Sequence, residues 1–295
     1  MMPISNLSDS WFAFATLPGV VQYAFAIAIG LVIGSFLNVV AHRLPIMMQR
    51  AWDADLAEAT GGSAPDDGLP ARYNLWVPRS GCTHCGHTLR AWENIPVLSY
   101  LALRGRCGHC AAPIGVRYPL MELVSGALAA GSLAVFGPGW LALAAFGLCA
   151  MLLAMSAIDM KTGYLPDSMT LPLLWAGLVV NLSGGFTGLH GAVTGAIAGY
   201  LFLWCVYWLF KWWRGIEGIG YGDLKLLAAI GAWLGWAALP QVLLIAAITG
   251  AVAGLAAMAR GRMRFEEPLP FGPFLALGAI VTLMFGTPLY PGIGG

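Results

Sequence analysis

The stretch GWLALAAFGLCAMLLAMSAI, residues 139–158, contains twenty consecutive residues with no charged side chain. A helix of about 20 mainly apolar residues is long enough to cross the hydrocarbon core of a bilayer. The stretch follows a Gly-Pro break and is closed by Asp159. It therefore predicts a membrane-spanning helix that carries a carboxylate at one end.

The rest of the chain has the same character. Of its 295 residues 59% are hydrophobic and 10% are charged, and its mean hydropathy is +0.75, whereas soluble domains have about 25% charged residues. Seven further apolar runs are long enough to be spans: 19–41, 119–136, 168–185, 188–210, 224–239, 241–259 and 270–290. We predict an all-α polytopic protein with about eight transmembrane helices, whose main partner is the lipid bilayer. The net charge of +1 argues against nucleic acid.

The distribution of basic residues predicts the topology. All 15 Lys and Arg lie in alternate loops, eight of them between Arg43 and Arg117. Because basic loops remain in the cytoplasm, both termini are expected on the outer side of the membrane. No Lys or Arg precedes the first span, so we expect it to be retained. The expected division is a first helix (1–41), a cytoplasmic domain (42–118) and a seven-helix core (119–295).

Two Cys-x-x-Cys pairs lie in the cytoplasmic segment, at Cys82 and Cys85 and at Cys107 and Cys110. The 21-residue separation is typical of a tetrahedral four-cysteine zinc site, and a closed thiolate shell predicts a structural metal. The reduced cytoplasm disfavours disulfides. Nearby histidines are interpreted as polar loop residues. Residues 50–70 look like a flexible, solvated insertion.

Four carboxylates are predicted at the cytoplasmic edges of spans, on Glu122, Asp159, Asp167 and Asp223. The simplest interpretation of Asp167 and Glu122 is that they stabilise helix N-termini. Asp159 differs because it lies at a helix C-terminus, where the dipole disfavours an anion. An ion pair with Lys161 is one explanation. The second explanation is that Asp159 pairs with Asp223. Asp223 also lies between apolar segments, where a charge is costly, and it has its own neighbouring lysine, Lys225.

Two neighbouring carboxyl groups share one proton, so that one member takes a proton from water while the other polarises a peptide carbonyl. Asp159 and Asp223 are therefore our candidate catalytic pair. Gly220 and Gly222 flank Asp223 in sequence and are expected to let a substrate backbone approach closely.

Several motifs occur in an order that resembles the type IV prepilin peptidases, also called prepilin leader peptidase/N-methyltransferases. These motifs are Gly34–Val40 with Arg43-Leu44-Pro45, Asn94–Tyr100, Arg117-Tyr118-Pro119 with Glu122, Asp159 with Leu165-Pro166-Asp167, Gly220–Lys225 and Pro270–Phe274.

The resemblance implies that Asp159 and Asp223 are the catalytic aspartates of a Gly-x-Gly-Asp intramembrane protease. It also implies cleavage of type IV prepilins or pseudopilins after a glycine, followed by methylation of the new N-terminus with S-adenosylmethionine. Glu122, Asp167, Lys225, Gly220 and Gly222 are candidates for substrate binding.

The methyl-transfer site has a weak candidate in Gly105 and Arg106, because glycine permits close approach and arginine binds carboxylates. Contact of this turn with lipid headgroups is an equally good interpretation. Two other functions stay open. One is a transporter or channel whose edge carboxylates bind ions. The other is a membrane methyltransferase without peptidase activity.

Overall fold

The computed structural model describes residues 14–63, 65–215, 220–261 and 269–286, and their regular structure is helical. The chain divides into two compact units, Met1–Leu133 and Ala134–Gly295. The first unit holds the four cysteines and the second holds Asp159 and Asp223.

In the first unit, α2 (Gly19–Thr60) packs against α4 (Arg117–Phe136) through small residues. A Cβ on Gly30 would lie 2.7 Å from the Cα of Gly126, and one on Gly34 would lie 2.7 Å from the Cα of Glu122. The Ser125 hydroxyl donates to the Gly30 carbonyl at 2.7 Å. Small residues spaced by four let two membrane helices approach closely, and this spacing fixes where α4 crosses α2.

The long α2 corrects the expectation of a flexible segment over residues 50–70. The helix has 42 residues and ends at Gly61, whose φ of 65° is left-handed. It is therefore roughly 63 Å long, about twice the thickness of the hydrocarbon core. Residues 51–60 include four alanines, and alanine is the strongest helix former, so the irregular part begins only after Thr60.

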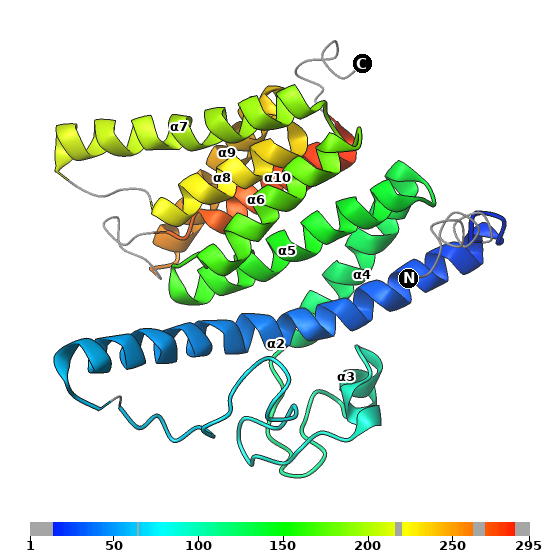
Figure 1. Cartoon of the computed structure of the whole chain (residues 1–295). Helices are drawn as coiled ribbons and strands as arrows, with labels where there is room; N and C mark the ends of the chain where they lie inside the picture. Colours follow the sequence, from blue (N-terminus) through cyan, green and yellow to red (C-terminus); the bar gives the residue numbers. More distant parts are fainter. Residues whose placement is uncertain (1–13, 64, 216–219, 262–268, 287–295) are drawn as a thin grey trace, which may run out of the picture. The chain divides into compact units, whose positions relative to one another are not determined.

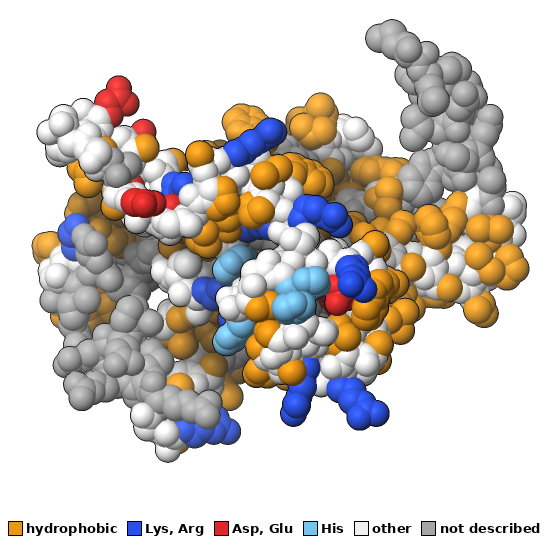
Figure 2. All heavy atoms as spheres, turned by 90° about the horizontal axis from the view of Figure 1, so that it is seen from below, with side chains coloured by type: hydrophobic (Ala, Val, Ile, Leu, Met, Phe, Trp, Pro, Cys, Tyr) orange, Lys and Arg blue, Asp and Glu red, His pale blue; other side chains and the backbone are white. Residues whose placement is uncertain are grey.

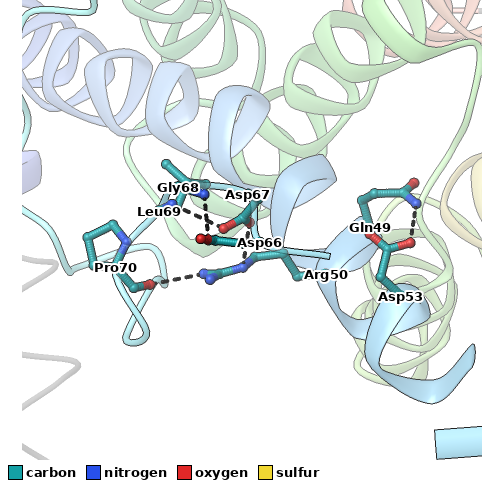
Figure 3. A network of polar contacts seen from close by, with 8 residues as sticks. All are labelled: Gln49, Arg50, Asp53, Asp66, Asp67, Gly68, Leu69 and Pro70. Carbon is teal, nitrogen blue, oxygen red and sulfur yellow. Dashed lines mark hydrogen bonds and ion pairs between the residues drawn. The ribbon is translucent and has the colours of Figure 1, made fainter. Parts of the chain in front are cut away.

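The chain after α2 returns along the helix and is attached to it by polar contacts (Figure 3). Arg50 pairs with Asp67 at 2.8 Å and donates to the Pro70 carbonyl at 3.1 Å. The carboxylates of Asp66 and Asp67 accept the main-chain N–H groups of Gly68 and Leu69. Asp66 and Asp67, in the segment predicted to be a solvated insertion, thus stabilise a turn.

In the second unit, helices pack around α8 (Figure 1), which contacts α6, α7 and α10. Its Leu226, Leu227 and Ile230 are completely buried. The helices are α5 (Trp140–Thr162), α6 (Asp167–Leu182), α7 (Leu189–Arg214), α8 (Tyr221–Leu234), α9 (Leu239–Ala259) and α10 (Gly272–Phe285). Single-turn helices η1 (Ala91–Asn94) and η2 (Trp236–Ala238) and the short α3 (Leu98–Ala102) complete the described elements.

Each of the eight predicted ranges contains a helix, but five are long and apolar enough to be membrane spans among the described residues. These are α2, α4, α5, α7, and η2 together with α9. Helices α6, α8 and α10 have 16, 14 and 14 residues. A 14-residue helix is about 21 Å long, short of the roughly 30 Å hydrocarbon core. The structure therefore supports a multi-pass protein with five candidate spans.

The buried side-chain amide of Asn181 holds the C-terminal end of α8 in place. The Asn181 side chain donates to the Ala232 and Trp233 carbonyls at 2.8 and 2.9 Å. Its oxygen accepts the N–H groups of Phe186 and Thr187 at 2.8 and 2.9 Å. All of the hydrogen-bonding capacity of the Asn181 side chain is used. The side chain therefore joins α6, the loop after α6 and the C-terminal end of α8 into one rigid group.

We expect Asn181→Leu to destabilise the protein by about 2–4 kcal/mol, because it leaves buried donors and acceptors unpaired. Unfolding in detergent monitored by circular dichroism measures this change. The control is Val179→Leu on the same helix, at a side chain that is 63% exposed. Equal unfolding midpoints for the two variants would refute the role assigned to Asn181.

Candidate active site and metal centre

The four cysteines converge as predicted. Their sulfur atoms all lie within 4.8 Å of one another, a group that could hold a metal ion. Figure 2 shows histidine side chains among basic ones at the surface. His87 and His109 stack on each other with ring centroids 5.0 Å apart. The four thiols alone make up the potential metal group among the described residues, and their number fits a tetrahedral ion.

The two cysteine turns have the same construction. Gly81 forms a bridge to Thr88, and Arg106 forms the equivalent bridge to Pro113. The residue after the second cysteine of each pair has a left-handed backbone, with φ of 69° at Gly86 and 57° at Ala111. The second turn therefore has a side chain at a position that favours glycine.

Ala111→Gly is expected to stabilise the metal centre by about 1 kcal/mol, because glycine adopts this conformation without the cost of a Cβ. Gly86→Ala should have the opposite effect. The measurement is the chelator concentration that removes half of the metal from protein loaded with zinc. If the two substitutions shift this concentration in the same direction, the conformational explanation is wrong.

The thiols differ in acidity. Hydrogen bonds from the main chain of Cys85 and then of His84 lower the pKa of Cys82 to about 6. At Cys110 the main chain of Ala112 acts in the same direction, but desolvation and hydrogen bonds to the other thiols raise the pKa to about 12. Because metals bind thiolates, a cation at this group displaces the remaining protons.

The second unit holds both candidate aspartates. Asp159 lies in the last turn of α5 and is 4% exposed, while Asp223 lies in the first turn of α8 and is 8% exposed. The two carboxyl groups interact electrostatically. Burial of two acids that repel each other is costly, which is typical of functional sites.

A third helix reaches Asp159. Its Oδ2 accepts the main-chain N–H of Gly272, at the start of α10, at 3.0 Å. Among the described residues, Gly272 is thus the hydrogen-bond donor to this carboxylate. Sequence reasoning assigned no role to Gly272, although the Pro270–Phe274 motif drew attention to the segment.

The two candidate glycines play different parts. A Cβ on Gly222 would lie 2.8 Å from that of Leu165, so this glycine makes room for a leucine. The nearest atom to a Cβ on Gly220 would be Oδ2 of Asp223, at 3.6 Å. Gly220 is therefore the position that leaves space beside the carboxylate.

The capping role expected for Asp167 is wrong. Pro166 is the N-cap of α6, and no side-chain capping bond forms there. Instead, Lys225 contacts both carboxylate oxygens of Asp167, at 2.7 and 2.6 Å. This pair joins the start of α6 to the start of α8, two residues beyond Asp223.

Glu122 also departs from its expected capping role. It lies beyond the first turn of α4 and accepts the N–H of Val97 at 2.8 Å. This bond joins α4 to the segment between the cysteine pairs. Glu122 belongs to the first unit, whereas the other three edge carboxylates belong to the second.

Gly105 and Arg106 lie in the second cysteine turn. Gly105 has φ of 68°, and a Cβ there would lie 2.9 Å from the Tyr100 hydroxyl. The space beside this glycine is thus used by Tyr100. Arg106 takes part in the bridge to Pro113.

Helical spans, buried edge carboxylates and a four-thiol group define a multi-pass membrane protein with a candidate hydrolytic centre. Residues 28–136 match the bacterial peptidase A24 N-terminal domain, and residues 146–255 match the type IV leader peptidase family. The chain belongs to this peptidase family.

Several relatives bear the name prepilin leader peptidase/N-methyltransferase. The Burkholderia pseudomallei (strain K96243) protein is 75% identical over 96% of this chain and 92% of its own length. The Aeromonas hydrophila protein is 50% identical over 90% of this chain and 91% of its own. The Pseudomonas aeruginosa protein is 49% identical over 88% and 89%. No solved structure matches the chain.

Proposed function

We propose that Asp159 and Asp223 form the catalytic pair of a prepilin leader peptidase that is also an N-methyltransferase. The enzyme cleaves the leader of type IV prepilins or related pseudopilins and methylates the new N-terminus. Its family membership supports this activity. The observation that carries the assignment is the burial of both carboxyl groups, one in the last turn of α5 and one in the first turn of α8.

In this mechanism the two carboxyl groups share one proton. The ionised group takes a proton from water as the water oxygen bonds to the scissile carbonyl carbon. The protonated group donates to the carbonyl oxygen, giving a tetrahedral intermediate. The group that took the proton from water then protonates the leaving nitrogen as the C–N bond breaks, and the other carboxylate recovers its proton from the hydroxyl of the intermediate as the carbonyl re-forms. The shortened pilin leaves as the amine product. Gly220 provides the space in which the substrate backbone lies beside Asp223.

The topology and domain division complete the proposal. Eight crossings, with α6, α8 and α10 as short spans, place both termini in the periplasm and residues 42–118 in the cytoplasm of the inner membrane. Both aspartates then lie at the cytoplasmic face. A basic prepilin leader would remain on that side of the membrane.

Two cofactors follow from the proposed activities. The four cysteines would hold a structural zinc ion, since four thiolates fill the tetrahedral shell and leave no position for water. S-adenosylmethionine supplies the methyl group. Gly105 and Arg106 stay the candidates for its binding, although Tyr100 occupies one side of Gly105.

Intact-mass measurement of a prepilin incubated with the purified protein tests the function. We expect loss of the leader, followed by gain of one methyl group only when S-adenosylmethionine is present. Methylation without loss of the leader would indicate a methyltransferase alone. An unchanged prepilin mass, both with and without S-adenosylmethionine, would favour the transporter or channel.

A further inference from the structure

We propose that the N-terminus of α10 is a third element of the active site, and that the Gly272 main chain positions the Asp159 carboxylate for catalysis. The inference rests on the proposed function of the aspartate pair. It assigns a task to the Pro270–Phe274 motif and makes Gly272 a positioning residue.

The Gly272 N–H is specifically available for this contact. In the first turn of α10, the N–H groups of Phe274 and Leu275 both bond to the Phe271 carbonyl. Pro273 has no N–H, which leaves Gly272 to donate to Asp159 Oδ2 at 3.0 Å in a buried bond. One carboxylate oxygen is thus held, and Oδ1 remains for Asp223, water or substrate.

The electrostatic arrangement explains how Asp159 is accommodated. Its position at the C-terminal end of α5 is unfavourable for a negative charge. The N-terminus of α10 presents the opposite end of a helix dipole to the same carboxylate. The α10 contact therefore offsets the penalty that the sequence predicted for an acid at this position.

Space at residue 272 is as important as the donor. A Cβ there would lie 2.7 Å from Asp159 Oδ2 and 3.2 Å from Leu165 Cδ1. Leu165 also fills the space left by Gly222, next to Asp223. Leu165 therefore packs against Gly222, in the segment that carries Asp223, and against Gly272, in the segment that binds Asp159. Glycine at 272 lets the carboxylate approach the main chain closely.

The test is the steady-state kinetics of prepilin cleavage by Gly272→Ala, with the unfolding midpoint measured on the same sample. A displacement of a reacting group by about 1 Å can reduce the rate about 100-fold. We therefore expect kcat to fall by about that factor, with KM and the unfolding midpoint nearly unchanged. Loss of positioning affects kcat, whereas damage to substrate binding would raise KM.

Gly278→Ala is the matched control on the same helix. Its Cβ would lie 2.5 Å from the Val242 carbonyl, so it disturbs α10 packing away from Asp159. We expect a lower unfolding midpoint and an unchanged kcat per folded molecule. If Gly272→Ala folds poorly, Leu165→Ala is added to relieve the 3.2 Å contact, and kcat should stay low.

A wild-type kcat for folded Gly272→Ala would overturn the inference, as would a loss that only follows the amount of folded protein. Asp159→Asn separates this failure from that of the proposed function. If Asp159→Asn still cleaves, the aspartate pair itself is wrong. If Asp159→Asn is inactive but Gly272→Ala is fully active, only the role of Gly272 is wrong.

Discussion

Cys107→Ser is expected to reduce the bound zinc from about one equivalent to none and to unfold the segment between the cysteine turns. Cys107 is the buried member of the group. This segment has few buried apolar side chains, and a structural zinc site contributes about 10–16 kcal/mol in small peptides. Removing one thiolate should therefore cost more than the local structure can supply.

Metal analysis of the purified protein, combined with limited proteolysis, measures both parts of this prediction. Cys205→Ser is the control, since Cys205 is exposed on α7 and lies outside the thiol group. It should keep the metal and the proteolysis pattern of the wild type. A folded wild-type protein without metal, or full metal content after Cys107→Ser, would contradict the account.

The convergence of the four cysteines was predictable because its signal is local. Each Cys-x-x-Cys pair fixes its own turn, and the separation of the pairs is typical of one ion. The extent of α2 was harder to predict. Pro45 and the double glycine at Gly61 and Gly62 favour breaks, yet the helix continues through Pro45 and ends only at Gly61. Helix-forming residues around Arg50 outweigh the single missing hydrogen bond.

The second large effect concerns the aspartates. Asp159→Asn and Asp223→Asn should each reduce leader cleavage by about 10³-fold or more, because each removes a group that the reaction uses directly. Asparagine keeps the carbonyl oxygen that accepts the Gly272 N–H, so the fold should be retained. Since the two groups act as a unit, the double variant should be little worse than either single one.

The control for both variants is Asp53→Asn, in the C-terminal part of α2, where the Asp53 carboxylate accepts a hydrogen bond from the Gln49 side chain at 2.9 Å. It should cleave at the wild-type rate. Methylation of a pilin that has already lost its leader should also persist in the aspartate variants. This second readout shows that the membrane protein is intact.

The partners of the acids could not be predicted from the sequence to the same extent. Helix polarity correctly identified Asp159 as an acid in need of compensation. The donor that provides it, Gly272, lies 113 residues away. Asp167 has an ordinary capping position in the sequence, but its carboxylate binds Lys225, 58 residues later. Such contacts depend on how α5, α6, α8 and α10 pack, and no local sequence pattern predicts them.

The central claim, that Asp159 and Asp223 act together in one peptidase site, is tested most directly by the cleaved fraction of a prepilin over time. The wild type, both Asn variants and Asp53→Asn are compared at equal concentrations of folded protein. We expect complete cleavage by the wild type and by Asp53→Asn. Over the same time, we expect no cleavage by Asp159→Asn or by Asp223→Asn. Wild-type cleavage by Asp159→Asn or by Asp223→Asn would contradict it.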